Sequence, residues 1–509
     1  MKQRLFTLLA ASCLFVGVQA QDIFQMADFS SEDLNGTARF VGMGGAMSAL
    51  GADMSVMGTN PAGIGLYRKS DVAASLSFVS QSKGRKYEGK DKNHVSFDNM
   101  GIVYVSKLKG TACRFLNIGF NYHKIKDFNQ IVNTSYDYGD TPGASQTWQM
   151  SDLSNYWGHP SAGTLLSDMG YQAYLLGDDY SAYNAGAYYY DKARWGSIQS
   201  YDFNISANFS DRVYAGITIG VQHVDYNSIS CYTEDLYTSD GTYDGLYNLT
   251  NYRDISGYGV NFKFGLIFRP IESSPFRVGL SVATRTHYDL KYRATASLDS
   301  YLGSEADESY REQATVRYDY NIKTPWKFGI SLGHTLTFGT SCLALDAEYE
   351  YSDYSTAEVT YGDDWDGWDD DEDLALNNEA DRWLNGVSTF KFGVEFMPIP
   401  EFAIRAGYNH VTSPVDHDAY VNQFINSASL DYATSTAYAV PSPTNRYTVG
   451  LGFNTNGFYI DATCKFENRH ARYYAFNTQA GSNTSENECP STKINLNNTQ
   501  ILFTVGYRF

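Results

Sequence analysis

Two glycine-rich stretches near the start of the chain are the first residues whose spacing could support chemistry. One runs from Gly42 to Gly51, and the other is Asn60-Pro61-Ala62-Gly63-Ile64-Gly65. Closely spaced glycines let a loop wrap a phosphate, and a dinucleotide-binding loop has the pattern G-x-G-x-x-G. Here Gly42 and Gly44 are followed by Met47 where the third glycine should stand, and no strand–helix unit surrounds them. The spacing argues against a nucleotide site.

An acidic run is the second candidate for chemistry. It extends from Asp363 to Asp373 and places eight carboxylates around Trp365 and Trp368. The spacing does not match the calcium loop of an EF-hand. We interpret the run as a solvated external loop. Weak bridging of divalent cations, within the loop or to lipopolysaccharide, is the alternative.

Signatures of catalysis and of cofactor binding are missing from the sequence. The nine histidines show no metal or haem spacing, no CxxC occurs, and neither G-x-S-x-G nor H-E-x-x-H is present. We therefore predict no catalytic residue, no metal and no cofactor, and expect a protein that is not an enzyme. Asp346, Glu348 and Glu350 resemble an acid/base group, but we expect them to pair with cations such as Lys391 and Arg405.

Composition narrows the elements that must position these residues. The 509 residues include 38 basic and 57 acidic side chains, and the formal net charge of −19 argues against nucleic acid as a partner. Aromatic residues reach 15% and charged residues only 19%, where roughly 25% is usual for a soluble domain. No mature stretch approaches the roughly 18 apolar residues of a membrane helix, so spanning a bilayer would require a closed barrel.

Residues 1–20 fit a secretory signal peptide. Lys2 and Arg4 precede an apolar run from Leu5 to Val18, and a small residue, Ala20, ends the segment. We expect the mature protein to be exported.

Cysteine usage supports neither a lipid anchor nor a disulfide framework. Ala10 stands where a lipoprotein signal would have leucine, which disfavours acylation of Cys13. Five cysteines remain after cleavage, and this odd number excludes a fully paired set: Cys113, Cys231, Cys342, Cys464 and Cys489.

From about residue 71 to the end, apolar and polar residues alternate in segments of roughly ten. Phe390, Phe392, Val394 and Phe396 alternate with polar or small residues, for example. This period places apolar side chains on one face of a strand. The fourteen predicted strands lie near 71–80, 95–107, 113–126, 198–210, 212–227, 255–269, 276–298, 312–338, 341–355, 386–398, 401–413, 444–455, 457–471 and 498–509.

The connections between these strands favour a barrel over a sandwich. Seven long gaps alternate strictly with six short ones, as in outer-membrane barrels with brief periplasmic turns and extended external loops. Pro325 interrupts the eighth strand, which we interpret as one strand with a bulge. The chain ends in Phe509, an ending typical of outer-membrane barrels. We predict an all-β, 14-stranded antiparallel transmembrane β-barrel over residues 71–509, located in the bacterial outer membrane.

Residues 21–70 do not alternate, and we interpret them as an N-terminal hatch, or plug, in the barrel lumen. Densely spaced small residues let backbone pass through a confined space. About fifty residues are enough to occupy the lumen of a fourteen-stranded barrel.

The sequence of this region resembles a known family. Thr37 to Gly65, TARFVGMGGAMSALGADMSVMGTNPAGIG, is similar to the hatch of the FadL/TodX family of outer-membrane transporters for hydrophobic compounds. The hallmark there is Asn-Pro-Ala after a GMGGA-like segment. Weaker resemblance lies at 163–176, 265–270, 276–290 and 324–329, and is greatest to a branch from Bacteroidetes-type bacteria, sometimes labelled hemin receptors. ATRTHYDL, at 283–290, departs from the family pattern and points to different inner-wall chemistry there.

The resemblance implies a passive channel for long-chain fatty acids or other hydrophobic small molecules, gated by the hatch. The residues carried over are the hatch or gate determinants Asn60, Pro61 and Ala62 and the glycines Gly42, Gly44 and Gly45. In the alternative interpretation, Pro61 fixes a turn and the glycines permit close packing without touching ligand. The alternative function is an outer-membrane binding or shuttle protein for secreted proteins, with a surface protein as partner.

Capture of a hydrophobic ligand outside the barrel requires an apolar surface. The external loop 127–197 is the best candidate, because it combines aromatic residues with apolar residues at helical spacing. A self-packed loop core is the alternative. The predicted capture residues are Trp148, Trp157, Leu165, Leu166, Met169 and Leu176. Outer-membrane lipids and lipopolysaccharide are the other expected partners.

Overall fold

The computed structural model describes residues 22–109, 112–158, 164–303, 308–361, 371–425, 427, 433–476 and 488–509. The predicted signal peptide, residues 1–20, lies outside the described residues, as does the greater part of the acidic run, residues 363–370.

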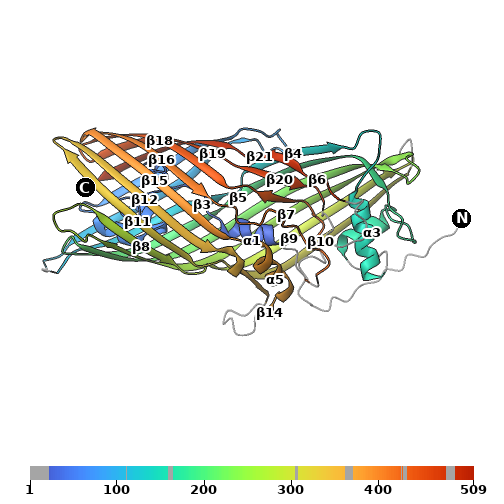
Figure 1. The fold of residues 1–509 in the computed structure, drawn as a ribbon, viewed down its shortest axis with the longest axis horizontal. Coiled ribbons are helices and arrows are strands. Elements are labelled where there is room, and N and C mark those ends of the chain that lie inside the picture. Colours follow the sequence, from blue (N-terminus) through green and yellow to red (C-terminus); the bar gives the residue numbers. More distant parts are fainter. Residues whose placement is uncertain are drawn as a thin grey trace.

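The chain forms a closed antiparallel barrel with fourteen wall segments, which confirms the predicted fold class (Figure 1). The ring closes where β1 pairs with β22 over eleven residues, from Asp71 opposite Arg508 to Gln81 opposite Asn498. Ten wall segments are single strands: β1 (Asp71–Gln81), β2 (Asn93–Lys107), β5 (Asn184–Phe209), β6 (Val213–Tyr237), β7 (Tyr243–Phe268), β15 (Gly386–Ile399), β16 (Phe402–Val411), β18 (Thr444–Thr455), β19 (Phe458–Asn468) and β22 (Asn498–Arg508).

The other four wall segments each contain two strands. They are β3 (Cys113–Asp127) with β4 (Gln130–Asp137), β8 (Arg277–Ala283) with β9 (His287–Leu302), β10 (Glu308–Lys323) with β11 (Lys327–Phe338), and β12 (Ser341–Asp353) with β13 (Glu358–Tyr361). β14 (Asp371–Glu372) pairs with β13. A separate small sheet holds β17 (Tyr438–Pro441), β20 (His470–Tyr474) and β21 (Thr492–Asn495).

The helices are short. Those before the first strand are α1 (Ile23–Ser30), α2 (Ala38–Gly42), η1 (Met54–Gly58) and η2 (Pro61–Leu66), and those after it are α3 (Gln146–Trp157), α4 (Leu165–Gln172), η3 (Tyr354–Thr356) and α5 (Leu374–Trp383). Among the described residues, no helix combines the length and the apolar character needed to cross a membrane.

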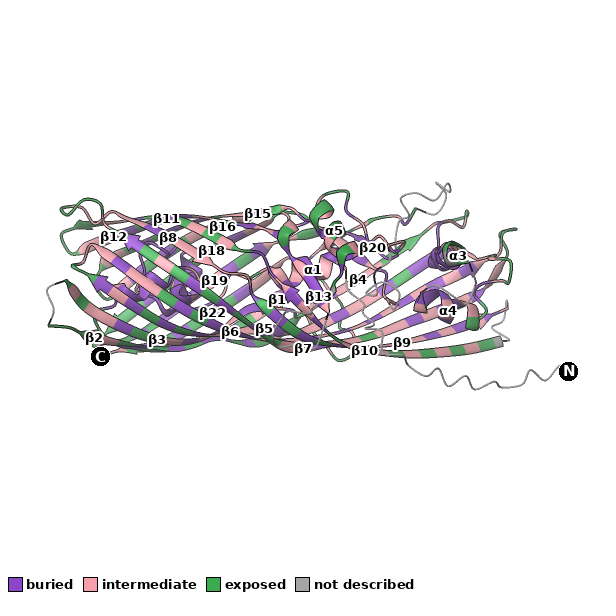
Figure 2. Ribbon diagram, turned by 90° about the horizontal axis from the view of Figure 1, so that it is seen from below, coloured by how far each residue is buried: buried purple, intermediate pink, exposed green. Residues whose placement is uncertain are grey.

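The wall is apolar outside and polar inside. On β18, Val449 is 61% exposed while its neighbour Thr448 is 3% exposed. On β15, Phe392 is exposed and Lys391 and Glu395 are buried. Figure 2 shows this alternation of exposed and buried residues along the wall strands. The apolar faces that the sequence pattern identified therefore point away from the barrel interior.

Several long loops of the sequence prediction are instead continuations of strands. Residues 228–254 were expected to form a loop, but β6 and β7 pair through most of this range and leave only residues 238–242 as a turn. Similarly, β4 and the first half of β5 lie inside the expected loop 127–197. Beyond the exposed apolar region both faces carry polar and aromatic residues, so the hydrophobic alternation fades while the backbone ladder continues.

Three neighbouring wall segments are interrupted near the same level. β10 and β11 are separated by Thr324-Pro325-Trp326, so the predicted bulge is a full break between two strands, and the count of wall segments stays even. The adjacent segments break at 284–286 and at 354–357. Side chains replace part of the ladder here: the Thr324 hydroxyl accepts from the Thr286 N–H at 2.8 Å. Proline lacks an N–H, which explains the break at this position.

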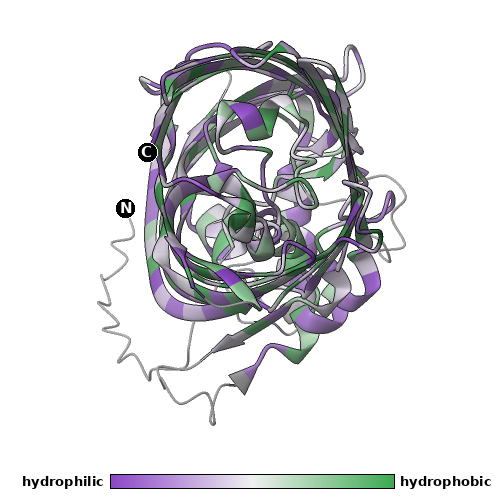
Figure 3. Ribbon diagram, turned by 90° about the vertical axis from the view of Figure 1, so that its left-hand side faces the viewer, coloured by the Kyte–Doolittle hydropathy of each residue, from purple (hydrophilic) through white to green (hydrophobic). Residues whose placement is uncertain are grey.

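Residues 22–70, here called the N-terminal segment, contact the inner face of the wall and appear in blue inside the barrel in Figure 1. Figure 3, seen along the barrel, shows helical turns within the ring of strands. The Ala38 N–H donates to Thr504 of β22 at 2.7 Å, and the Ala38 carbonyl accepts from Thr463 of β19 at 2.6 Å. Further around the ring, beyond β1, β2 and β3, the Pro61 carbonyl accepts from Ser206 of β5 at 2.7 Å. The segment therefore contacts strands that are far apart around the wall.

Candidate ligand-binding cavities

A cavity of about 250 Å³ lies on the side of the N-terminal segment that faces the long loops. We call it the upper cavity. One wall is α1, and the other is formed by barrel strands and by the small sheet β17–β20–β21. Its apolar lining includes Phe24, Ala27, Val132, Val387, Tyr438 and Leu496. This lining, apolar with a few charged side chains, suits an apolar ligand that carries a polar group.

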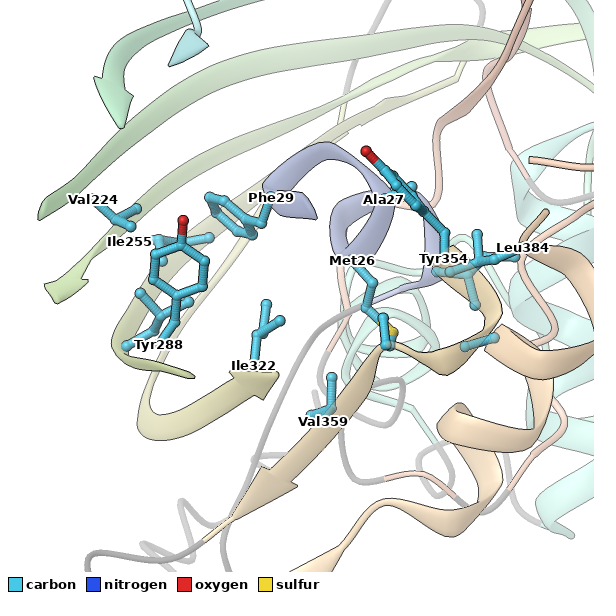
Figure 4. Close-up of a cluster of buried hydrophobic side chains, with 14 of the residues drawn as sticks. Met26, Ala27, Phe29, Val224, Ile255, Tyr288, Ile322, Tyr354, Val359 and Leu384 are labelled. Atoms are coloured by element: carbon cyan, nitrogen blue, oxygen red, sulfur yellow. The ribbon is translucent and has the colours of Figure 1, made fainter. Parts of the chain in front are cut away.

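α1 is positioned by its N-cap and by its buried face. Asp22 accepts a hydrogen bond from the Gln25 N–H at 2.8 Å, which satisfies a free donor of the first turn. Met26 and Phe29 are buried in a cluster with wall residues that include Val224 and Ile255 (Figure 4). This packing leaves Phe24 and Asp28 among the residues that line the upper cavity.

The carboxylate of Asp28 is held by two cations of the wall. Lys126 Nζ lies 2.9 Å from one carboxylate oxygen and Arg194 Nη1 lies 2.6 Å from the other. Burial alone would raise the pKa of Asp28, but the charges of Arg194 and Lys126 outweigh it and hold the pKa below its ordinary value. Asp28 is therefore ionised, and because two cations share its one carboxylate, the group of three carries a net positive charge.

Three further cations line the upper cavity without an ion pair. Lys192, Arg253 and Arg469 are half-buried, and none of them forms a salt bridge with any described residue. Arg253 lies over the Tyr292 ring, with its guanidinium carbon 5.7 Å from the ring centroid. A half-buried cation without a salt bridge is costly. The carboxylate of Asp22 also lines the cavity and acts on Arg253, but it is one negative charge against three positive ones, so the cavity favours an anionic group beside its apolar walls.

A second cavity of about 120 Å³, the middle cavity, adjoins the first and shares Glu32, Asp33 and Tyr354 with it. Its lysines form ion pairs, whereas Lys192, Arg253 and Arg469 of the upper cavity form none with the described residues. Lys327 lies 2.7 Å from Glu32, Lys391 lies 2.7 Å from Glu350, and Lys263 lies 3.2 Å from Asp202. The middle cavity is therefore polar and internally compensated.

The residues predicted to form the gate lie in a tightly bonded turn. Asn60 is fully buried and caps η2, where its side chain accepts from the Ala62 N–H at 3.2 Å. Its amide donates to Leu266 O of β7 at 3.5 Å. Pro61 is held by Ser206, as described above. Asn60, Pro61 and Ala62 do not line the upper or the middle cavity.

The three glycines of the predicted hatch lie against the wall. A side chain at Gly42 would meet the Thr463 hydroxyl at 2.9 Å, and one at Gly45 would meet Leu34 at 2.8 Å. Gly44 has a φ of +66° and would meet backbone atoms of Tyr408 and Phe392. All three positions permit close packing, and none lines the upper or the middle cavity.

The predicted capture residues are gathered in a packed region of the long-loop end. Leu166, Met169 and Leu176 are buried in one cluster with strand residues such as Tyr188, and Leu165 packs against that cluster. Trp148 donates from its indole N–H to Asn184 at 2.9 Å. The side chain of Trp157 lies outside the described residues.

The inward carboxylates meet cations in two cases of three. Glu348 and Glu350 both contact Lys391, at 2.8 and 2.7 Å. Asp346 instead accepts from the backbone N–H of Leu50 at 3.0 Å, because the N-terminal segment turns its amides towards it. Arg405 pairs with different carboxylates, those of Glu395 and Asp461, at 2.6 and 2.5 Å.

Sequence reasoning missed α1 and the cations of the upper cavity. Lys192 and Arg253 lie in strand extensions that were predicted to be loops, so no inward or outward position was assigned to them. Arg469 directly follows β19. Basic residues at inward positions of a strand were the available signal. Those inward positions can be assigned only when the register of β5 with β6 is known.

No protein-family model matches the sequence, and no curated protein matches it. Solved structures do match. A Pseudomonas aeruginosa FadL homologue is 10% identical, covers 94% of this chain and 99% of its own, and has a TM-score of 0.53. The Ralstonia pickettii toluene transporter TbuX is 14% identical, with coverage of 94% and 99% and a TM-score of 0.49. The Pseudomonas putida toluene transporter TodX is 12% identical, with the same coverage and a TM-score of 0.47. The first of these likenesses shows that the chain has the fold of that FadL homologue.

Proposed function

We propose that this protein is a passive channel of the bacterial outer membrane for hydrophobic small molecules that carry an anionic group, such as long-chain fatty acids. The N-terminal segment is the hatch that gates it. The observation that carries this proposal is the upper cavity, which combines apolar walls with three unpaired cations above a plugged lumen.

The placement in a membrane rests on the inverted wall. In water, exposed apolar surface costs roughly 25 cal/mol per Å², and the wall exposes apolar side chains on strand after strand. In a bilayer the same face is stabilised, and within the apolar region each wall segment pairs with both of its neighbours, so no strand edge faces lipid there. The short turns then face the periplasm and the long loops face outwards.

The ligand class follows from the chemistry of the upper cavity. Phe24, Val132 and Tyr438 offer contact to a hydrocarbon chain. Lys192, Arg253 and Arg469 offer hydrogen bonds to a carboxylate, which are stronger than bonds between neutral groups. A neutral hydrocarbon would use the apolar walls but would leave the three cations without a partner.

The gating role is proposed for the N-terminal segment as a whole. Its buried methionines, including Met43 and Met54, form one packed cluster with neighbouring residues, so passage of a ligand along the lumen requires part of the segment to move. The turn at Asn60-Pro61-Ala62 and the glycines Gly42, Gly44 and Gly45 belong to this gate. The hydrogen bonds of that turn to Leu266 and Ser206 must break if the turn itself is the moving part.

The test is binding of oleate to the purified barrel. We expect Lys192→Gln combined with Arg253→Gln to weaken oleate binding by about tenfold or more, since each charge-assisted hydrogen bond contributes about 1.5–3 kcal/mol. Binding of the neutral oleyl alcohol should change little. Lys83→Gln combined with Lys86→Gln is the matched control, because both lysines are exposed in the β1–β2 loop.

Failure of the purified barrel to bind either compound would overturn the channel proposal. Recovery of a secreted protein in stoichiometric amount from intact cells, without lipid in the cavities, would favour the shuttle function instead. The capture role of the loop residues around Leu166 and Met169 stays a separate prediction, which labelling of intact cells with the same ligand would address.

A further inference from the structure

The opposite side of the N-terminal segment holds a cleft of its own. It has a volume of about 400 Å³, and we call it the lower cleft. It lies between the end of the N-terminal segment, residues 66–69, and the short turns that join β15 to β16 and β18 to β19. Its volume is within the range of sites for small molecules.

The lower cleft is separate from the cavities above. It shares no lining residue with the upper cavity or with the middle cavity. The buried side chains of Met43, Met47 and Met54 fill the space of the N-terminal segment between them. The lower cleft therefore belongs to the periplasmic side of the proposed hatch.

Most charged side chains of the lower cleft form close ion pairs. Two of its cations do not: one has no ion pair with any described residue, and the other has only a long one. Arg39 and Arg405 share the carboxylates of Glu395 and Asp461. Lys69, by contrast, is exposed and forms no salt bridge with any described residue. Arg508 contacts Asp71 only at 3.4 Å and lies over the Tyr459 ring at 4.8 Å.

The remaining lining is apolar, with one opposing charge. Leu66, Met397, Ala403 and the ring of Tyr459 supply hydrocarbon surface. Glu401 is exposed at the edge and is the one carboxylate of this lining for which the described residues provide no ion pair. The lining holds more cations than carboxylates, so its own formal charge is positive, although Arg508 and Arg68 contact Asp71 and Asp211, which lie outside the lining. The five cations are Arg39, Arg68, Lys69, Arg405 and Arg508, and the three carboxylates are Glu395, Glu401 and Asp461.

We infer that the lower cleft is a second binding site for the same class of ligand, an amphiphile with a carboxylate, on the exit side of the hatch. Lys69 and Arg508 hold the carboxylate, and Leu66, Met397 and Ala403 contact the chain. This inference rests on the proposed function, and it adds that a ligand passing the hatch is bound a second time before it leaves.

The experiment is photolabelling of the full-length barrel with palmitate that carries a diazirine on its chain. Labelled peptides are mapped, and only labelling that unlabelled palmitate competes away is counted. We expect competed labelling at two places, around residues 397–403 and around residues 435–442. Ala403→Trp fills the lower cleft and should abolish only the first, whereas Ala439→Trp fills the upper cavity and should abolish only the second.

The role of the carboxylate is tested separately. Lys69→Gln should reduce labelling around residues 397–403 by about threefold to fivefold, since the contact is exposed to solvent. Lys83→Gln should leave it unchanged. The methyl ester of the photoprobe should label this region in the wild type no more strongly than the acid labels the Lys69→Gln variant, because the ester loses the charge contacts to both Lys69 and Arg508.

The outcomes separate this inference from the proposed function. Competed labelling only around residues 435–442 would overturn the second site and leave the channel proposal standing. Loss of competed labelling at both places in the wild type would overturn both. The assignment of an anionic ligand to this cleft would be overturned if labelling around residues 397–403 were unchanged by Lys69→Gln and equally strong with the methyl ester.

Discussion

At the scale of single residues, Gly44 is the glycine of the N-terminal segment whose added Cβ would come closest to the backbone of the wall. Its φ is +66°, and an added Cβ would lie 2.8 Å from the backbone nitrogen of Tyr408 and 3.1 Å from the carbonyl oxygen of Phe392. Neither atom can move without disturbing the pairing of β15 with β16. The glycine lets the segment approach the wall at this point.

We therefore expect Gly44→Ala to destabilise the folded barrel by about 2–4 kcal/mol, which combines left-handed strain with overpacking. Gly89→Ala is the matched control, because Gly89 has a φ of +75° but nothing within 4 Å of an added Cβ. It should cost about 1 kcal/mol, from strain alone. Urea unfolding, followed by the gel mobility of the heat-modifiable band, measures both. Equal effects of the two substitutions would contradict the proposed close contact.

At the scale of elements, the alternation of apolar and polar residues predicted the wall strands in the region where their outer face is apolar. β18, at Thr444–Thr455, coincides with its predicted range, and β3, β15 and β22 agree within about one residue at each end. Beyond the apolar region the pattern failed, because Tyr, Asn, Ser and Thr occupy both faces of β6 and β7. The site depends on these same extensions, so Lys192 and Arg253 could not be assigned to it from the sequence.

The ion pairs inside the barrel connect elements that the sequence places far apart. Arg39 of α2 donates two hydrogen bonds to Glu395 of β15, at 2.9 and 2.8 Å, and Arg405 of β16 shares the same carboxylate. Removal of one partner from such a buried group leaves an uncompensated charge. The link between α2 and the wall should therefore contribute strongly to the position of the N-terminal segment.

We expect Arg39→Ala to lower the free energy of unfolding by about 3–5 kcal/mol, as is usual for a broken buried pair. Arg68→Ala is the comparison. It removes an ion pair of similar N–O distance, Arg68 with Asp211 at 2.6 Å, but both of these side chains are partly exposed. Its cost should stay below about 1 kcal/mol. The measurement is again urea unfolding, here at low and high salt. A loss below about 1 kcal/mol for Arg39→Ala would mean that α2 is held by its hydrogen bonds alone.

At the scale of the whole molecule, the wall and the N-terminal segment have separate sources of stability. Each of the fourteen wall segments pairs with both neighbours, so the ring closes without the segment. The segment instead depends on the ring, through contacts such as those of Ala38 with Thr463 and Thr504. Removing the segment should therefore open the lumen and leave the ring intact.

The final prediction concerns ion conductance. Deletion of residues 31–66, with residues 1–21 kept for export, should give a folded barrel with a large, steady conductance in planar bilayers, because the buried cluster around Met43 and Met54 is lost. Deletion of residues 22–30 alone is the matched control. It removes α1 and one wall of the upper cavity but leaves that cluster in place, so ion conductance should stay near the wild-type level while oleate binding falls. Equal conductance of the two deletions would contradict the assignment of the barrier to the buried cluster alone, and two closed variants would assign the barrier to the long loops.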